Sequence, residues 1–415
     1  MMIHLRIPLL ILMLVGGAVG WAFPDELPFW RSAAIISGWL GWGLLLSSLL
    51  LMIREPWLAA RLGGLEKMYL WHHRLGVFAY LVLLLHPLAL AVAGWDESPS
   101  LVWAAIDPRQ QSWPEWMGWA ALLCLMGGLA VSLTHHLPYR RWRSLHHLLS
   151  LSVVFGFAHL WLLGLDYPLL GMPLLAIFFI VWRLLRADYG LAARPYLVSR
   201  VEHLAEGMVE VRLRPLAGAV TAQAGQFVIV AFFDGPTFRG CAEYHPFTIS
   251  DSEVDGSFSL GIKALGECTR HLQSIETGVA ARVQGPFGDF LQNCTKGPAL
   301  WVAGGIGLAP FLAVLRKAHL AQPVHLIYLH RNASDAAYLD ELTALAVTQQ
   351  QLVLEVVESG ELPADLSAVI PGATDLLGRQ CYLCGPPGLL AATINLLRAR
   401  GMAPKQIHFE RFDFR

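Results

Sequence analysis

The chain has 415 residues, of which 55% are hydrophobic and only 15% charged, a composition too apolar for an ordinary soluble protein. Its formal net charge of -1 gives no reason to expect nucleic-acid binding. The apolar excess ends near Arg186, and the rest has the composition of a soluble α/β protein. We therefore expect a membrane half followed by a soluble half.

Six apolar segments precede that boundary. They cover roughly residues 3–23, 29–53, 69–94, 116–135, 145–165 and 168–187. Each approaches the ~20 residues that a helix needs to cross a bilayer. The first segment could instead be a signal peptide, because His4 and Arg6 precede its apolar run. The pattern predicts an all-α six-helix transmembrane bundle over residues 1–189.

The charged residues of the connecting loops predict the orientation. Lys and Arg gather in loops 54–68 and 136–145 and at the end of the sixth segment, whereas acidic residues gather in loop 95–115. Basic loops favour the cytoplasmic side of a membrane. We therefore expect a multi-pass protein of the cell (inner) membrane with both termini in the cytoplasm.

Histidines recur in the third and fifth segments. His72 and His86 are fourteen residues apart, which on a helix is ~21 Å of rise and ~40° short of four turns. The fifth segment carries His146 or His147 at its cytoplasmic end and His159 farther out. Histidine inside a lipid-spanning helix is costly and is a functional candidate. We predict that His72 and His146 bind an inner haem and that His86 and His159 bind an outer one, with His73 and His147 as neighbours of the ligands.

One spacing fits this arrangement poorly. His146 and His159 are thirteen positions apart. On a straight helix this spacing places the two side chains ~140° apart around the helix axis. Either this helix is irregular, with Gly156 as a candidate site, or the two haems are approached from different sides.

The soluble half changes pattern part-way. Short β-type runs separated by Gly and Pro turns predict a small antiparallel β-barrel over residues 190–295. From residue 296 strands alternate with helices, which predicts an α/β domain with a parallel sheet to residue 415. The fold class is thus a multi-domain membrane protein: a helical bundle, an antiparallel barrel and a parallel-sheet nucleotide domain.

Five turns of the soluble half carry candidate binding residues. The motif HPFTIS offers an apolar wall and a hydroxyl for a flavin, and the glycine-rich turns offer backbone N–H groups to phosphates. GPFGDF at 285–290 is a further Gly-Pro turn. The candidates are His245, Pro246, Phe247, Thr248 and Ser250; Lys263, Gly266 and Thr269; Gly304, Gly305 and Gly307; and Gly385 and Pro386.

The six cysteines lie scattered along the chain. The single CxxC pair, Cys381 and Cys384, has no second pair, so a zinc site is not expected. We expect free thiols in a reducing cytoplasm.

The ordered set HPFTIS, GPFGDF, GGIGLAPF, YLCGPPG and HFERFDF resembles ferredoxin–NADP reductase-type flavoproteins. With the histidine-bearing half in front, the chain resembles the ferric reductase / NADPH oxidase superfamily. The resemblance implies FAD in the barrel, NAD(P)H in the last domain and two b-type haems. It places Cys384 by the nicotinamide, Glu410 beside the flavin and Phe412 stacked on it, with Phe414 as the alternative. Arg331 and Tyr338 resemble positions that hold a 2′-phosphate, which favours NADPH over NADH.

The function that follows is transmembrane electron transfer. Cytoplasmic NAD(P)H would reduce FAD, and electrons would pass through both haems to ferric iron or oxygen on the outer face. Family oxidases often carry a second polar group where this chain has Leu90. An electron-supply subunit for a periplasmic protein partner is the first alternative, and a haem-free helical anchor with a flavoprotein appended is the second.

Overall fold

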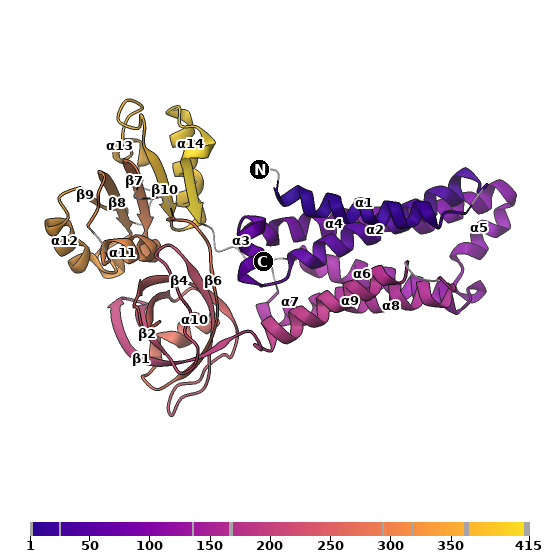
Figure 1. Cartoon of the computed structure of the whole chain (residues 1–415), viewed down its shortest axis with the longest axis horizontal. Coiled ribbons are helices and arrows are strands. Elements are labelled where there is room, and N and C mark those ends of the chain that lie inside the picture. Colours follow the sequence, from indigo (N-terminus) through magenta and orange to yellow (C-terminus); the bar gives the residue numbers. More distant parts are fainter. Residues whose placement is uncertain are drawn as a thin grey trace. The chain divides into compact units, whose positions relative to one another are not determined.

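The computed structural model describes residues 3–24, 26–134, 137–165, 169–292, 294, 296–317, 319–360 and 365–410. The chain divides into two compact units, one of residues 1–54 and 61–189 and the other of residues 55–60 and 190–415. Figure 1 labels many of the helices and strands of both, and each unit is described by itself.

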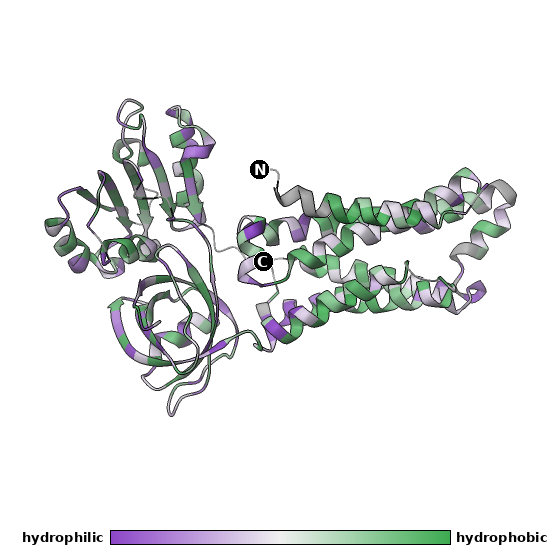
Figure 2. Ribbon diagram, in the orientation of Figure 1, coloured by the Kyte–Doolittle hydropathy of each residue, from purple (hydrophilic) through white to green (hydrophobic). Residues whose placement is uncertain are grey.

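The first unit is helical. Its elements are α1 (Ile3–Trp21), α2 (Phe29–Leu51), α3 (Pro56–Leu62), α4 (Leu65–Glu97), α5 (Pro99–Ile106), η1 (Pro108–Gln110), α6 (Trp113–Ser132), α7 (Tyr139–His146), α8 (Leu148–Leu162), α9 (Gly171–Arg183) and the π-helical η2 (Leu184–Asp188). Helix α2 packs along α4, and α6 packs along α8. Figure 2 shows hydrophobic residues along most of their length.

Four stretches of the described chain are long and apolar enough to cross a membrane: Phe29–Leu51, Leu65–Trp95, Trp113–Ser132 and Arg140–Leu162. The remaining two predicted spans correspond to α1, of 19 residues, and to α9, of 13 residues. The expected membrane character is confirmed, and the count of six spans stays a prediction.

The first half of unit 2 is a closed antiparallel barrel with strand order β1-β2-β5-β4-β3-β6. Its elements are β1 (Arg194–Ala205), β2 (Met208–Pro215), β3 (Phe227–Phe232), β4 (His245–Ser252), β5 (Phe258–Lys263), α10 (Glu267–His271), η3 (Leu272–Ser274) and β6 (Ala280–Phe287). The alternate residues Val209, Val211 and Leu213 of β2 lie fully buried in the barrel core, as the two-residue period of a strand requires.

The second half of unit 2 is a five-stranded parallel sheet with order β11-β10-β7-β8-β9. Its elements are β7 (Ala299–Gly304), η4 (Gly305–Leu308), α11 (Ala309–Leu315), β8 (Val324–His330), η5 (Ala333–Asp335), α12 (Leu339–Thr348), β9 (Leu352–Glu358), α13 (Leu366–Val369), β10 (Gln380–Cys384), α14 (Pro387–Ala399), η6 (Pro404–Gln406) and β11 (Ile407–Glu410). Every residue of β7 is buried, which is typical of a central parallel strand covered on both faces. The predicted barrel and parallel sheet are confirmed.

Candidate electron-transfer sites

The four predicted histidine ligands lie on three helices. Helix α4 carries His72 and His86, α7 ends at His146, and α8 carries His159. The irregularity expected at Gly156 lies instead at His147, where α7 stops and α8 begins. Gly156 is inside α8, and a Cβ there would come within 2.7 Å of Trp42 Cζ2. Gly156 therefore serves helix packing. Because the irregularity at His147 lies between His146 and His159, the directions of these two side chains need not be those of a straight helix.

All four imidazoles are anchored through Nδ1. His72, His86 and His159 donate this N–H to the carbonyl oxygens of Ser48 at 2.8 Å, Ala34 at 2.8 Å and Pro114 at 2.7 Å. His146 Nδ1 lies 2.8 Å from the hydroxyl of Ser132, whose own hydrogen is donated to the carbonyl of Gly128. That hydroxyl must therefore accept from His146. Every Nε2 then carries a free lone pair, which is the tautomer that a metal ligand needs.

Two glycines make room for the outer pair of imidazoles. A Cβ at Gly38 would lie 3.2 Å from His86 Nδ1, and a Cβ at Gly118 would lie 3.1 Å from His159 Nδ1. Each glycine stands four residues after the carbonyl that its histidine binds, so one helical turn of α2 and one of α6 form similar cradles.

The outer imidazoles lie near one another, with ring centroids 6.4 Å apart and ring planes at 76°. If one iron were bound by both rings, two metal–nitrogen bonds of about 2 Å plus two nitrogen-to-centroid distances of about 1 Å would separate the centroids by about 6 Å. One iron therefore fits between them. The sequence-predicted pairing of the inner ligands, His72 with His146, stays a prediction. His73 and His147 are exposed, whereas the four predicted ligands are partly buried.

Strand β4 presents the HPFTIS motif. Phe247, 7% exposed, belongs to the barrel core and packs edge-on against Phe232, with ring centroids 6.2 Å apart. His245 and Pro246 at the start of the strand are partly exposed, and Thr248 is 8% exposed. Their flavin contacts stay predictions.

Ser250 occupies a polar network that sequence reasoning missed. It is fully buried, and its hydroxyl donates to Glu210 of β2 at 2.5 Å. Arg316, which follows α11, donates to Glu210 at 2.9 Å and to Glu341 of α12 at 2.6 Å. Although burial lowers the pKa of Arg316, its hydrogen bonds to Glu341 and Glu210 raise that pKa overall. The network joins the barrel to the α/β domain, and Ser250 is engaged there rather than exposed to a cofactor.

Tyr338 belongs to the same network. Its hydroxyl donates to Glu210 at 2.9 Å, and burial together with the Glu210 carboxylate raises the pKa of Tyr338 well above its usual value. The side chain is 5% exposed, so it does not offer its hydroxyl to a phosphate in solution. Arg331 is exposed just after the carboxyl end of β8, where a nucleotide phosphate could reach it. Of the two residues predicted for a 2′-phosphate, only Arg331 is accessible.

The turn after β5 holds the residues predicted to meet a pyrophosphate. Thr269 accepts hydrogen bonds from the backbone N–H groups of Leu265 at 2.9 Å and Gly266 at 2.8 Å, which fixes the turn before α10. Lys263 lies 3.8 Å from Asp335 and 3.8 Å from the position of a Cβ on Gly305. Lys263 therefore lies beside the first turn of the nucleotide domain.

The glycine turns of the parallel sheet meet at its carboxyl edge, where such sheets bind ligands. A Cβ on Gly307 would lie 2.6 Å from the carbonyl carbon of Cys384, and one on Gly304 would lie 2.8 Å from Pro386 Cδ. A Cβ on Gly385 would lie 3.1 Å from the Cα of Gly304. Only glycine allows these two turns to approach one another this closely.

Cys384 and Glu410 end adjacent strands at this edge. They are paired across β10 and β11, and both are buried. Burial and the neighbouring Glu410 carboxylate raise the pKa of the Cys384 thiol well above its usual value, so the sulfur stays protonated. A Cβ on Gly288, in the GPFGDF turn of the barrel, would lie 3.4 Å from Glu410 Oε1. Phe412 and Phe414 lie outside the described residues.

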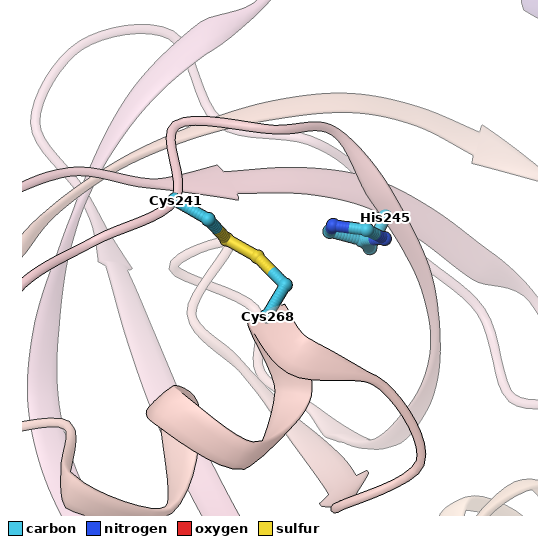
Figure 3. A group of neighbouring side chains, drawn as sticks. All are labelled: Cys241, His245 and Cys268. Atoms are coloured by element: carbon cyan, nitrogen blue, oxygen red, sulfur yellow. A yellow bond between two sulfur atoms is a disulfide. The ribbon is translucent and has the colours of Figure 1, made fainter. Parts of the chain in front are cut away.

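The expectation of free thiols throughout is wrong for one pair. Cys241 and Cys268 form a disulfide, with their Cα atoms 5.8 Å apart. Figure 3 shows the pair beside His245. No sequence spacing pointed to it, because the two residues come from a loop and a short helix separated by 27 positions.

The comparisons with known proteins agree with this order of domains. Residues 37–157 match the ferric reductase like transmembrane component family, 195–298 match an FAD-binding domain, and 301–394 match an oxidoreductase NAD-binding domain. The chain is a ferric reductase/NADPH oxidase-like fusion with a ferredoxin–NADP reductase-type module. This fusion is an oxidoreductase with domains for FAD and NAD(P)H.

Curated relatives match about half of the fusion. The ferredoxin–NAD(P)+ reductase component of the naphthalene 1,2-dioxygenase/salicylate 5-hydroxylase systems of a Ralstonia species is 29% identical over 231 residues, 52% of this chain and 67% of that protein. The toluate 1,2-dioxygenase electron transfer component of Pseudomonas putida is 27% identical, over 52% of this chain and 66% of that protein. The chain thus spans about two thirds of the length of these relatives.

Solved structures also match the chain. A flavohemoglobin from Malassezia yamatoensis has a TM-score of 0.50 at 15% identity and covers 92% of this chain and 97% of its own. A cytochrome P450 reductase from Amycolatopsis has a TM-score of 0.44 at 24% identity and covers 53% of this chain and 69% of its own.

Proposed function

We propose that this chain transfers electrons from cytoplasmic NAD(P)H, through FAD and two b-type haems, to an acceptor on the outer face of the cell membrane. Ferric iron and oxygen are the candidate small-molecule acceptors, and a periplasmic protein is the alternative. When bound, FAD accepts a hydride and releases single electrons, and haem iron carries one electron at a time.

The observation that carries the proposal is the shared tautomer of four membrane histidines. Each donates Nδ1–H to the protein, so each offers Nε2 to a metal. A histidine that served only helix packing would be expected to hydrogen-bond through both ring nitrogens, because an unpaired polar atom is costly in lipid. His72 and His146 would hold the inner haem, and His86 and His159 the outer one.

The chain's own residues would bind and orient the nucleotides in the soluble unit. The touching turns at Gly307 and Cys384 support a dinucleotide at the carboxyl edge of the sheet, and Arg331 supports NADPH because its exposed guanidinium matches a phosphate. The thiol of Cys384, kept neutral by burial, would adjoin the nicotinamide without adding charge. Thr248 and the Thr269 turn support FAD at the barrel.

The loop charges support the orientation. Arg54, Arg61 and Lys67 lie in loop 54–68, and Arg140 and Arg143 lie in loop 136–145, whereas loop 95–115 has a single basic residue, Arg109. This is the distribution expected when both termini face the cytoplasm.

Reconstitution in sealed vesicles tests the proposal. Purified protein should show a Soret band, and NADPH added to the side that bears the soluble unit should reduce a ferric chelate trapped on the other side. Vesicles in which the chelate is mixed with NADPH on the same side control for direct reduction by FAD. Superoxide dismutase separates the acceptors, because only cytochrome c reduction that passes through oxygen is sensitive to it. A colourless membrane unit would contradict the haem assignment and leave a tethered flavoprotein.

A further inference from the structure

A thiol pair lies at the strand predicted to face the flavin. Cys241 precedes β4 by four residues, and Cys268 lies on α10, next to Thr269 of the predicted pyrophosphate turn. Their sulfur atoms and a ring nitrogen of His245 all lie within 4.8 Å of one another (Figure 3). The bond between the cysteines therefore joins the two segments of the barrel to which FAD binding is assigned above.

The two cysteines differ in exposure. Cys241 is partly exposed, whereas Cys268 is 8% exposed. A solvent-accessible cysteine beside a buried partner is the usual arrangement of a redox-sensing thiol and its resolving thiol. His245 lies against the pair, with its Nε2 3.6 Å from the carboxylate of Glu243. An imidazole beside a thiol favours the thiolate, which is the form that attacks disulfides.

We propose that Cys241 and Cys268 form a reversible thiol–disulfide switch, operated by low-molecular-weight disulfides, that controls how tightly the barrel retains FAD. This inference rests on the proposed FAD site and on the cytoplasmic orientation. A cytoplasm keeps ordinary protein thiols reduced, so a bond formed there is a response to oxidation rather than a permanent link.

The exchange is balanced in two steps. The thiolate of Cys241 attacks one sulfur of the small disulfide, forms a mixed disulfide and releases one small thiolate. The thiolate of Cys268 then attacks the Cys241 sulfur, forms the internal bond and releases the second small thiolate. Two electrons pass to the small disulfide, which becomes two thiols, and the two protein thiols lose two protons.

The bond should tighten flavin binding. It ties the loop before β4 to the helix whose N-terminal turn is fixed by Thr269, so both segments are ordered before FAD arrives. Ordering a site in its bound shape strengthens binding because less conformational entropy is lost. We expect FAD to dissociate on the order of tenfold more slowly from the oxidised chain.

Flavin release from the full-length protein in detergent tests this inference. Protein equilibrated with oxidised glutathione or with dithiothreitol is diluted, and the fluorescence of released FAD is followed with time. Alkylation and peptide mass spectrometry report the state of the pair. Cys241→Ser and Cys268→Ser cannot form the disulfide. Under both conditions they should release FAD as fast as the dithiothreitol-treated wild-type protein does. Cys294→Ala, which changes a buried thiol elsewhere in the unit, should keep the wild-type difference.

Four results would overturn the switch. FAD that binds with the same release rate in both redox states refutes it while leaving the proposed function intact, whereas a protein that binds no FAD in either state refutes the proposed function itself. A bond that withstands dithiothreitol in the folded protein shows a permanent link. Stoichiometric Zn²⁺ held by the reduced pair, and lost in Cys241→Ser, shows a metal site instead.

Discussion

Gly307 packs against the carbonyl group of Cys384 so closely that a Cβ on the glycine would lie 2.6 Å from the carbonyl carbon. This contact joins the first and the penultimate strands of the parallel sheet at their carboxyl ends. The two turns predicted to bind the nucleotide therefore form one continuous backbone surface.

Gly307→Ala should open that contact. Forcing a methyl group into a closely packed backbone costs about 1–3 kcal/mol, and the turns must separate to admit it. We expect a lower melting temperature and a several-fold higher KM for NAD(P)H. Gly388→Ala, at the second residue of α14 where a Cβ meets no atom within 4 Å, is the matched control and should leave both quantities near wild type. Equal effects of the two variants would show that the Gly307 contact is unimportant.

Removing an outer histidine should remove one haem. His86→Ala or His159→Ala deletes one of the two ligands proposed for the outer haem, so haem content per FAD should fall by about half, while NADPH-driven reduction of FAD continues. Haem extraction and flavin fluorescence measure the two contents. The exposed His73 and His147 supply the controls, and their alanine variants should keep both haems. If His86→Ala and His159→Ala each retain full haem content, the ligand assignment is incorrect.

Gly118→Ala probes the cradle rather than the ligand. The new methyl group would press on Nδ1 of His159 from 3.1 Å and disturb its bond to Pro114. We expect a shifted midpoint potential or partial loss of the outer haem alone, measured by a spectroscopic redox titration. Gly127→Ala in the same helix brings only an ordinary contact of 3.7 Å with Leu148, and it should titrate like wild type. An unchanged titration in Gly118→Ala would argue against the cradle.

Glu210→Gln should loosen the link between the barrel and the α/β domain. It leaves partly buried Arg316 with one carboxylate instead of two and weakens the acceptor for Tyr338, which should cost about 2–4 kcal/mol. Thermal unfolding followed by tryptophan fluorescence should show a clear fall in melting temperature. Glu202→Gln breaks the exposed pair with Arg200 and should change stability by less than about 1 kcal/mol. Comparable losses in both variants would exclude a special role for the network.

Local pattern was enough to predict some of these features. The period of a helix aligned His72 with His86, and glycine-rich turns after buried strands located Gly304, Gly307 and Gly385. Features that depend on distant pairing were not predictable. Glu210 meets Arg316 across 106 positions, and Cys241 meets Cys268 through a loop and a one-turn helix. The carbonyl groups that accept hydrogen bonds from the histidines also belong to neighbouring helices. The sequence patterns of α4 and α8 therefore could not predict these hydrogen bonds.

The joint between α7 and α8 has a wider consequence for comparing related chains. In a straight helix, the number of residues between two side chains fixes both their separation along the helix axis and the angle between them around it. The one-residue irregularity at His147, with φ -65° and ψ -11°, lies between the two histidines, so their relative direction need not be that of a straight helix. Related chains with a different number of residues between these two histidines could still place them at the same two depths in the membrane. A sequence motif that requires one fixed spacing would miss such chains.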